Sequence, residues 1–103
     1  MDATLLQSIC DCQRQGQAAV LVTIIQTKGS TPRKAGSQML VLPTGEVQGT
    51  IGGGCAEAEA KQQALLALQI GKAHVYTIEM LNAVAADEGM VCGGTMTLFL
   101  QVL

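Results

Sequence analysis

The feature that most constrains the fold is an apolar run near the start of the chain, VLVTII at residues 20–25. Most of these residues are β-branched, and polar residues do not alternate with them as they do in a half-buried strand. A run of this kind is typical of a strand that is buried on both faces. It therefore predicts a strand over residues 18–27 in a sheet that other elements cover.

The rest of the chain alternates between helical and strand-like patterns. Helices are predicted at residues 2–16, from the capping residue Asp2 to Gly16, and at residues 55–70, which Gly71 ends. Strands are predicted at residues 38–42, 47–51, 74–79 and 95–102, with residues 43–46 as a hairpin turn. The fold class that follows is α+β, with a single mixed β-sheet of about five strands covered by two helices, in one domain of residues 1–103.

Each predicted helix has an apolar face at helical spacing. In the first helix we expect this face to be Leu5, Leu6, Ile9 and Cys10, with Cys10 in the core and Cys12 incidental. In the second helix the face consists of small residues, which allow the helix to sit close to the sheet: Ala56, Ala60, Ala64, Ala67 and Leu68.

The composition indicates an aliphatic core. Aromatic residues make up only 2% of the chain, against 49% hydrophobic residues. Such a core lacks the large buried areas that aromatic rings supply. We therefore expect a further protein chain, most simply a second copy in a homo-oligomer, to cover part of the apolar surface.

Charge and hydropathy exclude several classes of protein. The net charge is -2, and basic residues neither cluster in a run nor interleave with aromatic ones, so we expect no nucleic-acid partner. No apolar stretch is long enough to span a membrane, and residues 1–17 lack the pattern of a secretion signal. We therefore expect a cytoplasmic location, where the four cysteines remain thiols.

Three segments are rich in glycine: residues 29–36 (GSTPRKAG), 49–57 (GTIGGGCAE) and 89–94 (GMVCGG). Glycine is entropically costly to order, so such clusters indicate special backbone angles or a close approach to another group.

The second glycine segment leads directly into a predicted helix. The free N–H groups and partial positive charge of a helix start bind anions and stabilise a thiolate, which makes Cys55 a candidate reactive or ligating sulfur. The candidate site residues here are Gly52, Gly53, Gly54, Cys55 and Glu57, where Glu57 either complements the helix dipole or faces the site. The alternative is that the glycines only permit tight packing and that Cys55 is a small buried hydrophobe.

The first and third glycine segments supply two further candidate groups, the guanidinium of Arg33 and the thiol of Cys92. Cys92 and Gly93 come just before the last strand, and two convergent sulfurs at Cys55 and Cys92 would suit a soft metal, a dithiolene or a redox exchange. Two unrelated turn cysteines are the alternative. Ser30 and Arg33 lie on a loop that Pro32 stiffens, and a guanidinium there suits phosphate or carboxylate recognition, although a solvated turn has the same composition.

Taken together and in order, the three segments resemble the xanthine dehydrogenase accessory protein family, XdhC/CoxI. That family has the patterns Gly-Ser-x-Pro-Arg-x-x-Gly, Gly-x-Ile-Gly-Gly-Gly-Cys-x-Glu and Gly-Met-Val-Cys-Gly-Gly, and this chain matches them at residues 29–36, 49–57 and 89–94. Typical members continue into a second, Rossmann-type domain. Since this chain stops at Leu103, we expect a standalone N-terminal domain of the family, which a separate Rossmann-domain protein would complement.

The resemblance implies an accessory factor rather than an enzyme with turnover. Such a protein binds the molybdenum cofactor (molybdopterin), guards it while a sulfurase acts, and delivers it to the apo-enzyme of a xanthine dehydrogenase-like molybdenum hydroxylase. Arg33 and the helix start near Gly54 would hold its phosphate, and Cys55 or Cys92 would approach the metal. Two other functions remain compatible with the residues: a thiol redox protein that uses Cys55 and Cys92, and a non-catalytic interaction module.

Overall fold

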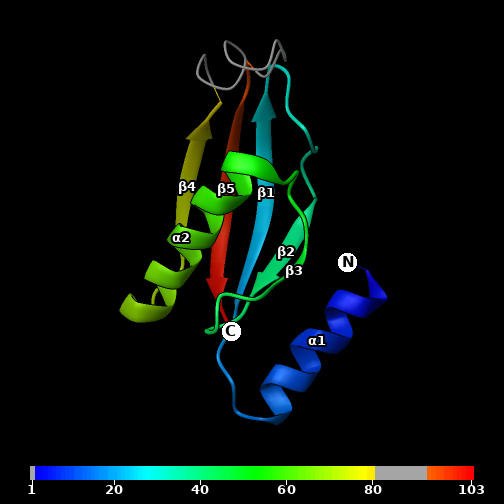
Figure 1. The fold of residues 1–103 in the computed structure, drawn as a ribbon, viewed down its shortest axis with the longest axis vertical. Helices are drawn as coiled ribbons and strands as arrows, with labels where there is room; N and C mark the ends of the chain where they lie inside the picture. The colour runs from blue at the N-terminus through cyan, green and yellow to red at the C-terminus, as the bar shows by residue number, and fades with distance from the viewer. Residues whose placement is uncertain (1, 81–92) are drawn as a thin grey trace.

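The computed structural model describes residues 2–80 and 93–103 and contains one sheet and two helices. Along the chain the elements are α1 (Ala3–Arg14), β1 (Val20–Lys28), β2 (Gln38–Val41), β3 (Val47–Gly49), α2 (Gly54–Ile70), β4 (His74–Glu79) and β5 (Thr95–Val102). Figure 1 shows α2 crossing one face of the sheet and α1 beside its lower end. The predicted α+β class, with five strands and two helices, is confirmed.

The sheet is antiparallel throughout the described strands, so the prediction of a mixed sheet is wrong. The strand order is β3-β2-β1-β5-β4, and every neighbouring pair runs antiparallel. The physical reason is the position of β5. In Figure 1, β1 and β4 point the same way, and β5 runs between them in the opposite direction. The insertion of β5 separates two strands that would otherwise form a parallel pair.

Alanines hold α2 against the sheet. Ala60, Ala64 and Ala67 are fully buried and Ala56 nearly so, as the pattern predicted. They face a layer of fully buried aliphatic residues from β1, β2 and β5: Val20, Val22, Ile24, Met39, Val41, Met96, Leu98 and Leu100. The fully buried side chains of the helix are alanine methyl groups, which allow a close approach to the sheet, and Leu65 and Leu68 pack against the same core as half-buried residues. This layer is the main core, and it is aliphatic as the composition predicted.

The opposite face of the sheet is covered only in part, by α1. Asp2 caps this helix, since its Oδ1 accepts from the Thr4 N–H at 2.7 Å. The buried stripe is Leu5, Ile9 and Cys12, which pack on Ala19, Leu21, Leu40 and Leu42. The predicted assignment of the α1 cysteines is therefore wrong: Cys12 is buried and Cys10 is exposed, because Cys12 continues the i, i+4, i+7 spacing from Leu5.

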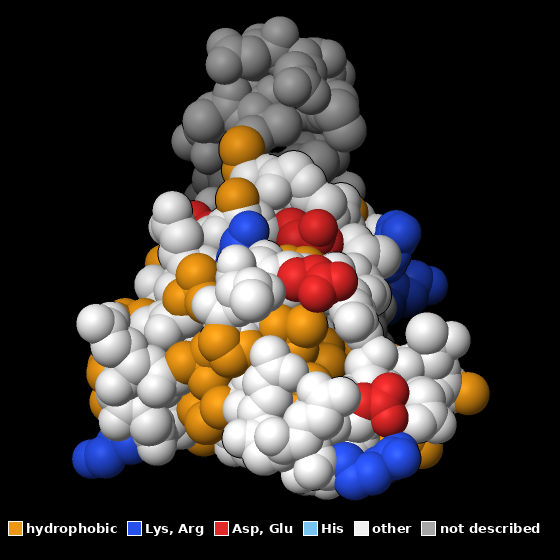
Figure 2. All heavy atoms as spheres, turned by 60° about the horizontal axis from the view of Figure 1, so that its bottom comes forward, with side chains coloured by type: hydrophobic (Ala, Val, Ile, Leu, Met, Phe, Trp, Pro, Cys, Tyr) orange, Lys and Arg blue, Asp and Glu red, His pale blue; other side chains and the backbone are white. Residues whose placement is uncertain are grey.

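Part of the apolar surface stays uncovered in the isolated chain. The far end of β1 projects beyond α1, so Ile25 is 49% exposed, although the apolar run predicted burial on both faces. Figure 2 shows hydrophobic side chains gathered on one face, between charged residues at its margins. The exposed large hydrophobic residues are Leu6, Ile25, Leu66, Ile70, Val75 and Leu103. Neither described helix is long and apolar enough to cross a membrane.

The close approach of α2 gives a stability prediction. We expect Ala64→Leu to lower the free energy of unfolding by about 1–3 kcal/mol, because the larger side chain must be forced between helix and sheet. Ala58→Leu is the matched control: Ala58 lies on the exposed side of the same helix, so the effect should stay within about 0.5 kcal/mol. Urea denaturation of both variants measures the difference. Equal losses of unfolding free energy in the two variants would show that the packing of α2 on the sheet does not require small residues.

A second prediction concerns the single tyrosine, Tyr76 on β4, whose hydroxyl donates to Glu59 Oε2 on α2 at 2.8 Å. This hydrogen bond, with desolvation and the negative charge of Glu59, raises the pKa of Tyr76 above 10.0. The hydrogen bond therefore stabilises the fold fully below the tyrosine's unfolded pKa and is lost as pH rises through the folded pKa. Because the chain has no tryptophan, a tyrosinate absorbance titration follows Tyr76 directly. Glu59→Gln should lower this pKa and Glu46→Gln, at a distant turn, should not; identical titrations of all three proteins would refute the interaction.

Candidate functional site

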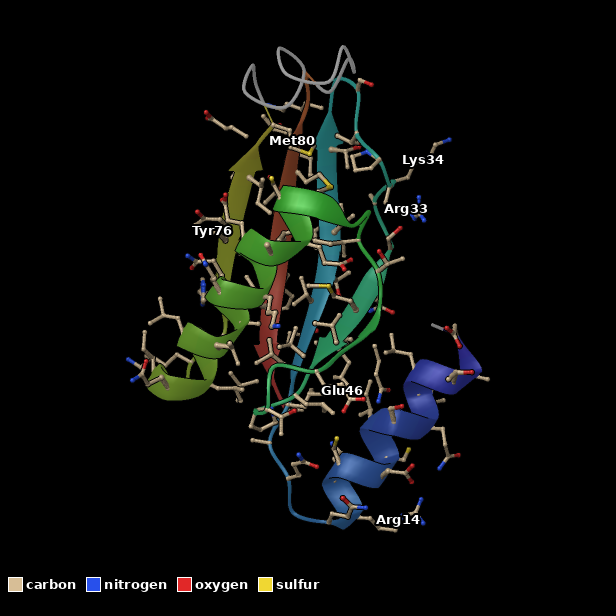
Figure 3. The ribbon with its side chains drawn as sticks, viewed as in Figure 1. Arg14, Arg33, Lys34, Glu46, Tyr76 and Met80 are labelled. Carbon is tan, nitrogen blue, oxygen red and sulfur yellow. The ribbon has the colours of Figure 1, made fainter. Side chains whose placement is uncertain are left out.

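The first glycine segment forms the loop between β1 and β2. Backbone hydrogen bonds close the loop on β1, from the Gly36 N–H to Ile24 O at 2.7 Å and from the Ile24 N–H to Ser37 O at 2.9 Å. Within the loop, Thr31 Oγ1 donates to Arg33 O at 2.8 Å, and an Arg33 guanidinium N–H donates to Pro32 O at 3.1 Å. Figure 3 shows Arg33 and Lys34 on the outer side of the loop, pointing away from the sheet.

Gly52 brings the second glycine segment against this loop. Its φ is +126°, and a Cβ at this position would lie 2.6 Å from Pro32 Cγ and 2.8 Å from Pro32 Cβ. Only a residue without a side chain allows so close an approach. The proline ring therefore packs directly on the turn before α2, so that the two segments, separate in sequence, are in contact.

Gly94 brings the third segment to the same loop. A Cβ on Gly94 would overlap Ser30 O, and it would lie 2.5 Å from Lys28 O and 2.8 Å from Thr31 Cγ2. The contact is equally close from the other side, since a Cβ on Gly29 would lie 3.1 Å from Gly94 Cα. The loop after β1 thus contacts the second segment through Pro32 and the third through its backbone. We call this meeting of the three segments the glycine junction.

Glu57 braces the turn that precedes α2. Its Oε1 accepts from Thr50 Oγ1 at 2.6 Å, from the Ile51 N–H at 3.2 Å and from the Gly53 N–H at 3.3 Å. Thr50 Oγ1 in turn accepts from the Gly52 N–H at 3.0 Å. The sequence analysis did not identify Thr50 as part of this turn. The feature that could have identified it is a hydroxyl side chain in the same glycine segment as Glu57. The side chain of Glu57 therefore acts on its own chain, and it fixes the conformation of the glycine turn.

The start of α2 is open. Gly53 is the N-cap residue, with φ +74°, and no side chain of the described residues caps the helix. A Cβ on Gly53 or Gly54 would meet no atom within 4 Å, so other groups can approach the backbone there. Cys55 is the second residue of the helix, and its free thiol is exposed rather than buried. The alternative interpretation of Cys55 as a buried hydrophobe is therefore wrong.

The predicted site residues are distributed unevenly around the junction. Ser30, Gly52 and Gly93 belong to the contacting segments, whereas Arg33 lies at their outer rim. Cys92 lies outside the described residues, so a site shared by Cys55 and Cys92 stays a prediction. Within residues 2–80 and 93–103, no three His, Cys, Asp or Glu side chains lie together as a metal site.

Comparison with known proteins identifies relatives along most of the chain. The sequence model of the XdhC and CoxI family matches residues 12–79. The Escherichia coli (strain K12) protein YqeB is 37% identical over 90 residues, which are 87% of this chain and 16% of YqeB. The molybdenum cofactor insertion chaperone PaoD of the same organism is 33% identical over 100 residues, which are 97% of this chain and 31% of PaoD.

Two further similarities extend the comparison. In Bacillus subtilis (strain 168), a protein named as a probable subunit of xanthine dehydrogenase is 40% identical over 60 residues, 58% of this chain and 17% of that protein. The crystal structure of a Bacillus halodurans xanthine dehydrogenase superposes with a TM-score of 0.75 at 24% identity, over 94% of this chain and 30% of that one, which shows a shared fold. This chain spans less than a third of the length of each of these proteins.

The glycine junction predicts a sharp difference between two adjacent glycines. We expect Gly94→Ala to lower the free energy of unfolding by about 3 kcal/mol, because the new methyl group collides with backbone that cannot rotate away. Gly93→Ala is the matched control, since a Cβ there meets no atom within 4 Å, and its effect should stay within about 0.5 kcal/mol. Thermal and urea unfolding of both variants measure this. If both tolerate alanine equally, the close contact between the segments is not real.

Proposed function

Because this chain belongs to the XdhC and CoxI family, we propose that it binds the molybdenum cofactor and assists the maturation of a molybdenum hydroxylase. The similarity to PaoD, named as a molybdenum cofactor insertion chaperone, supports this role and covers 97% of the chain. The similarity to a probable xanthine dehydrogenase component supports a hydroxylase of that type as the recipient.

The open start of α2 beside the glycine junction is the observation that carries the proposal. The first-turn N–H groups of a helix point outward with partial positive charge, and they bind phosphate. At Gly53 and Gly54 no Cβ stands between the backbone and an approaching group, and the structure leaves space there. These residues therefore fit the phosphate of the cofactor, and we assign the Gly54 and Cys55 N–H groups to it.

Arg33 and Ser30 would complete the phosphate site. The Arg33 Cγ would lie 3.8 Å from a Cβ on Gly52, so the stem of this side chain is beside the turn that leads to α2. Among the described residues, its guanidinium donates to the Pro32 carbonyl oxygen of its own loop, and it can exchange that bond for a charge-assisted one. The exposed position of Arg33 is consistent with a residue that moves when its ligand arrives.

Cys55 would supply sulfur at the same place. A thiolate is a soft donor, and it would suit the molybdenum of the cofactor, which dithiolene sulfurs already hold, better than the oxygen donors nearby. The cofactor brings the metal and its redox chemistry; the chain contributes binding, orientation and protection from water. We assign Cys92 and Gly93 to the same site, through the third glycine segment.

We propose that the protein acts as an accessory factor, without turnover of its own. Its partners would be the hydroxylase apo-enzyme that receives the cofactor and a sulfurase that acts on the cofactor while it is bound. In this proposal Glu57 contributes indirectly, because it holds the glycine turn in the conformation that directs the first N–H groups of α2 outward.

The test is cofactor binding by variants of two exposed cysteines. We expect Cys55→Ser to weaken molybdenum cofactor binding by about tenfold or more, since a sulfur donor at the site is lost. Cys10→Ser is the control, because Cys10 is equally a free, exposed thiol but lies on α1. Binding is measured by co-elution of pterin and molybdenum with the protein, and delivery by activation of a hydroxylase apo-enzyme.

The same variants separate the proposal from its rivals. A reversible disulfide between Cys55 and Cys92 without cofactor binding would indicate a thiol redox protein instead. Complex formation with a partner that survives both Cys55→Ser and Cys92→Ser, again without cofactor binding, would indicate an interaction module. Equal cofactor affinity of Cys55→Ser and Cys10→Ser would remove Cys55 from the site.

A further inference from the structure

The exposed side of α2 carries no charged residue. Its side chains recur at the spacing of three and four residues that places them along one face of a helix, and in Figure 1 no described element lies in front of this face. We call this face the outer stripe; its residues are Cys55, Ala58, Gln62, Leu66, Gln69 and Ile70. The side of a helix that faces water normally carries charged residues, so the outer stripe lacks the usual composition of a solvated surface.

The charged side chains of α2 all contact the chain itself. Glu57 braces the turn before the helix, and Glu59 accepts from the Tyr76 hydroxyl at 2.8 Å. Lys61 lies along the turn between β2 and β3, since a Cβ on Gly45 would lie 3.2 Å from its Cε. These three residues are half-buried and leave the outer stripe without charge.

The other helix shows the ordinary pattern. Asp11 and Arg14 are exposed on α1 and form an ion pair at 3.0 Å. On the outer stripe, by contrast, Leu66 is 42% exposed and Ile70 is 58% exposed. The centres of protein interfaces are depleted of charged residues in the same way. The outer stripe therefore has the composition of a surface that binds another protein.

The size of the outer stripe indicates what kind of complex it supports. A helix of 17 residues is about 25 Å long and about 10 Å wide, so one face of it offers about 250 Å². Each partner in a stable complex contributes about 800 Å². The outer stripe by itself therefore suits a partner that binds and leaves, and it is too small for a permanent pair of chains.

The position of the outer stripe relates it to the site proposed above. It begins at Cys55, the second residue of α2, next to the backbone of Gly53 and Gly54 that we assign to the cofactor phosphate. A protein that takes over a group bound at this end of the helix must come into contact with the same end. The outer stripe is the uncharged surface that continues from it along α2.

We infer that the outer stripe is the docking surface for the recipient apo-hydroxylase, an inference that rests on the proposed function. Leu66, near the middle of the exposed length, is the apolar anchor of the contact. The facing surface of the hydroxylase is apolar and uncharged at its centre, because a charge placed there would lose its water without gaining an opposite charge on α2.

A charge placed within the outer stripe tests the inference. Gln62→Lys and Leu66→Lys should each weaken association with the apo-hydroxylase by about tenfold or more, because the contact would bury an unpaired charge. Gln13→Lys is the matched control, since it makes the same change at an exposed position on α1. Surface plasmon resonance measures association with a xanthine dehydrogenase prepared without its cofactor. Circular dichroism should be the same for all variants.

The two exposed thiols provide an independent footprint. The apo-hydroxylase should slow the alkylation of Cys55 by iodoacetamide and leave that of Cys10 on α1 unchanged, as measured by mass spectrometry of the peptides. Equal protection of both thiols, or protection of Cys10 alone, would overturn the inference. Both experiments use the chain without cofactor, so they are independent of the binding test for Cys55→Ser.

The remaining outcomes separate this inference from the proposed function. A parent protein that retains the cofactor but does not associate with the apo-hydroxylase, or that associates as well as Leu66→Lys does, overturns the docking surface alone. A parent protein that fails to retain the cofactor overturns the proposed function. Self-association that Leu66→Lys abolishes in sedimentation would show that a second copy covers the outer stripe instead.

Discussion

The close packing of α2 on the sheet is the constraint on which the rest of the structure depends. Four alanines form the buried face of this helix, so the side chains at the centre of the contact are small, while Leu65 and Leu68 pack against the core as half-buried residues. A contact of that kind leaves little freedom to tilt or slide, because any shift opens voids or forces methyl groups into neighbours. The position of Gly54, where the helix begins, is therefore set by the core. The positions of the backbone groups at the candidate site therefore depend on the packing of α2 against the aliphatic core, and no residue of that core belongs to the candidate site.

The glycines near the site serve two distinct purposes. Gly52 and Gly94 are required by their neighbours, since Pro32 in one case and loop backbone in the other occupy the space of a side chain. Gly53 and Gly54 have no such neighbours, and their positive φ angles shape the turn that leads into the helix. The first pair holds separate segments together, and the second pair keeps the helix start accessible. In the run of three glycines, Gly52 therefore forms part of the glycine junction, and Gly53 and Gly54 keep the start of α2 accessible.

Much of this architecture was predictable from local sequence patterns. Strict alternation placed β5 at residues 95–102, and the alanine spacing identified both α2 and its buried face. Strand direction was not predictable, because it depends on where β5 enters the sheet rather than on any segment's own pattern. The burial of Cys10 and Cys12 was predicted the wrong way round for a similar reason. Each fits an apolar stripe on α1, and only the position of the helix on the sheet decides which of the two is buried. The bracing role of Glu57 needs three donors that the fold brings to one oxygen, and sequence reasoning offered only its place near the helix start.

That same carboxylate has an electrostatic consequence. Glu57 sits in the first turn of α2, where its negative charge offsets part of the positive potential of the helix dipole. It also accepts from the Ile51 and Gly53 N–H groups, which precede Gly54, the first residue of the helix. In the proposed phosphate site, the negative charge of this carboxylate would oppose the binding of an anion. If the chain binds and delivers the cofactor as proposed, this partial neutralisation of the helix start would weaken phosphate binding and so make release of the cofactor easier.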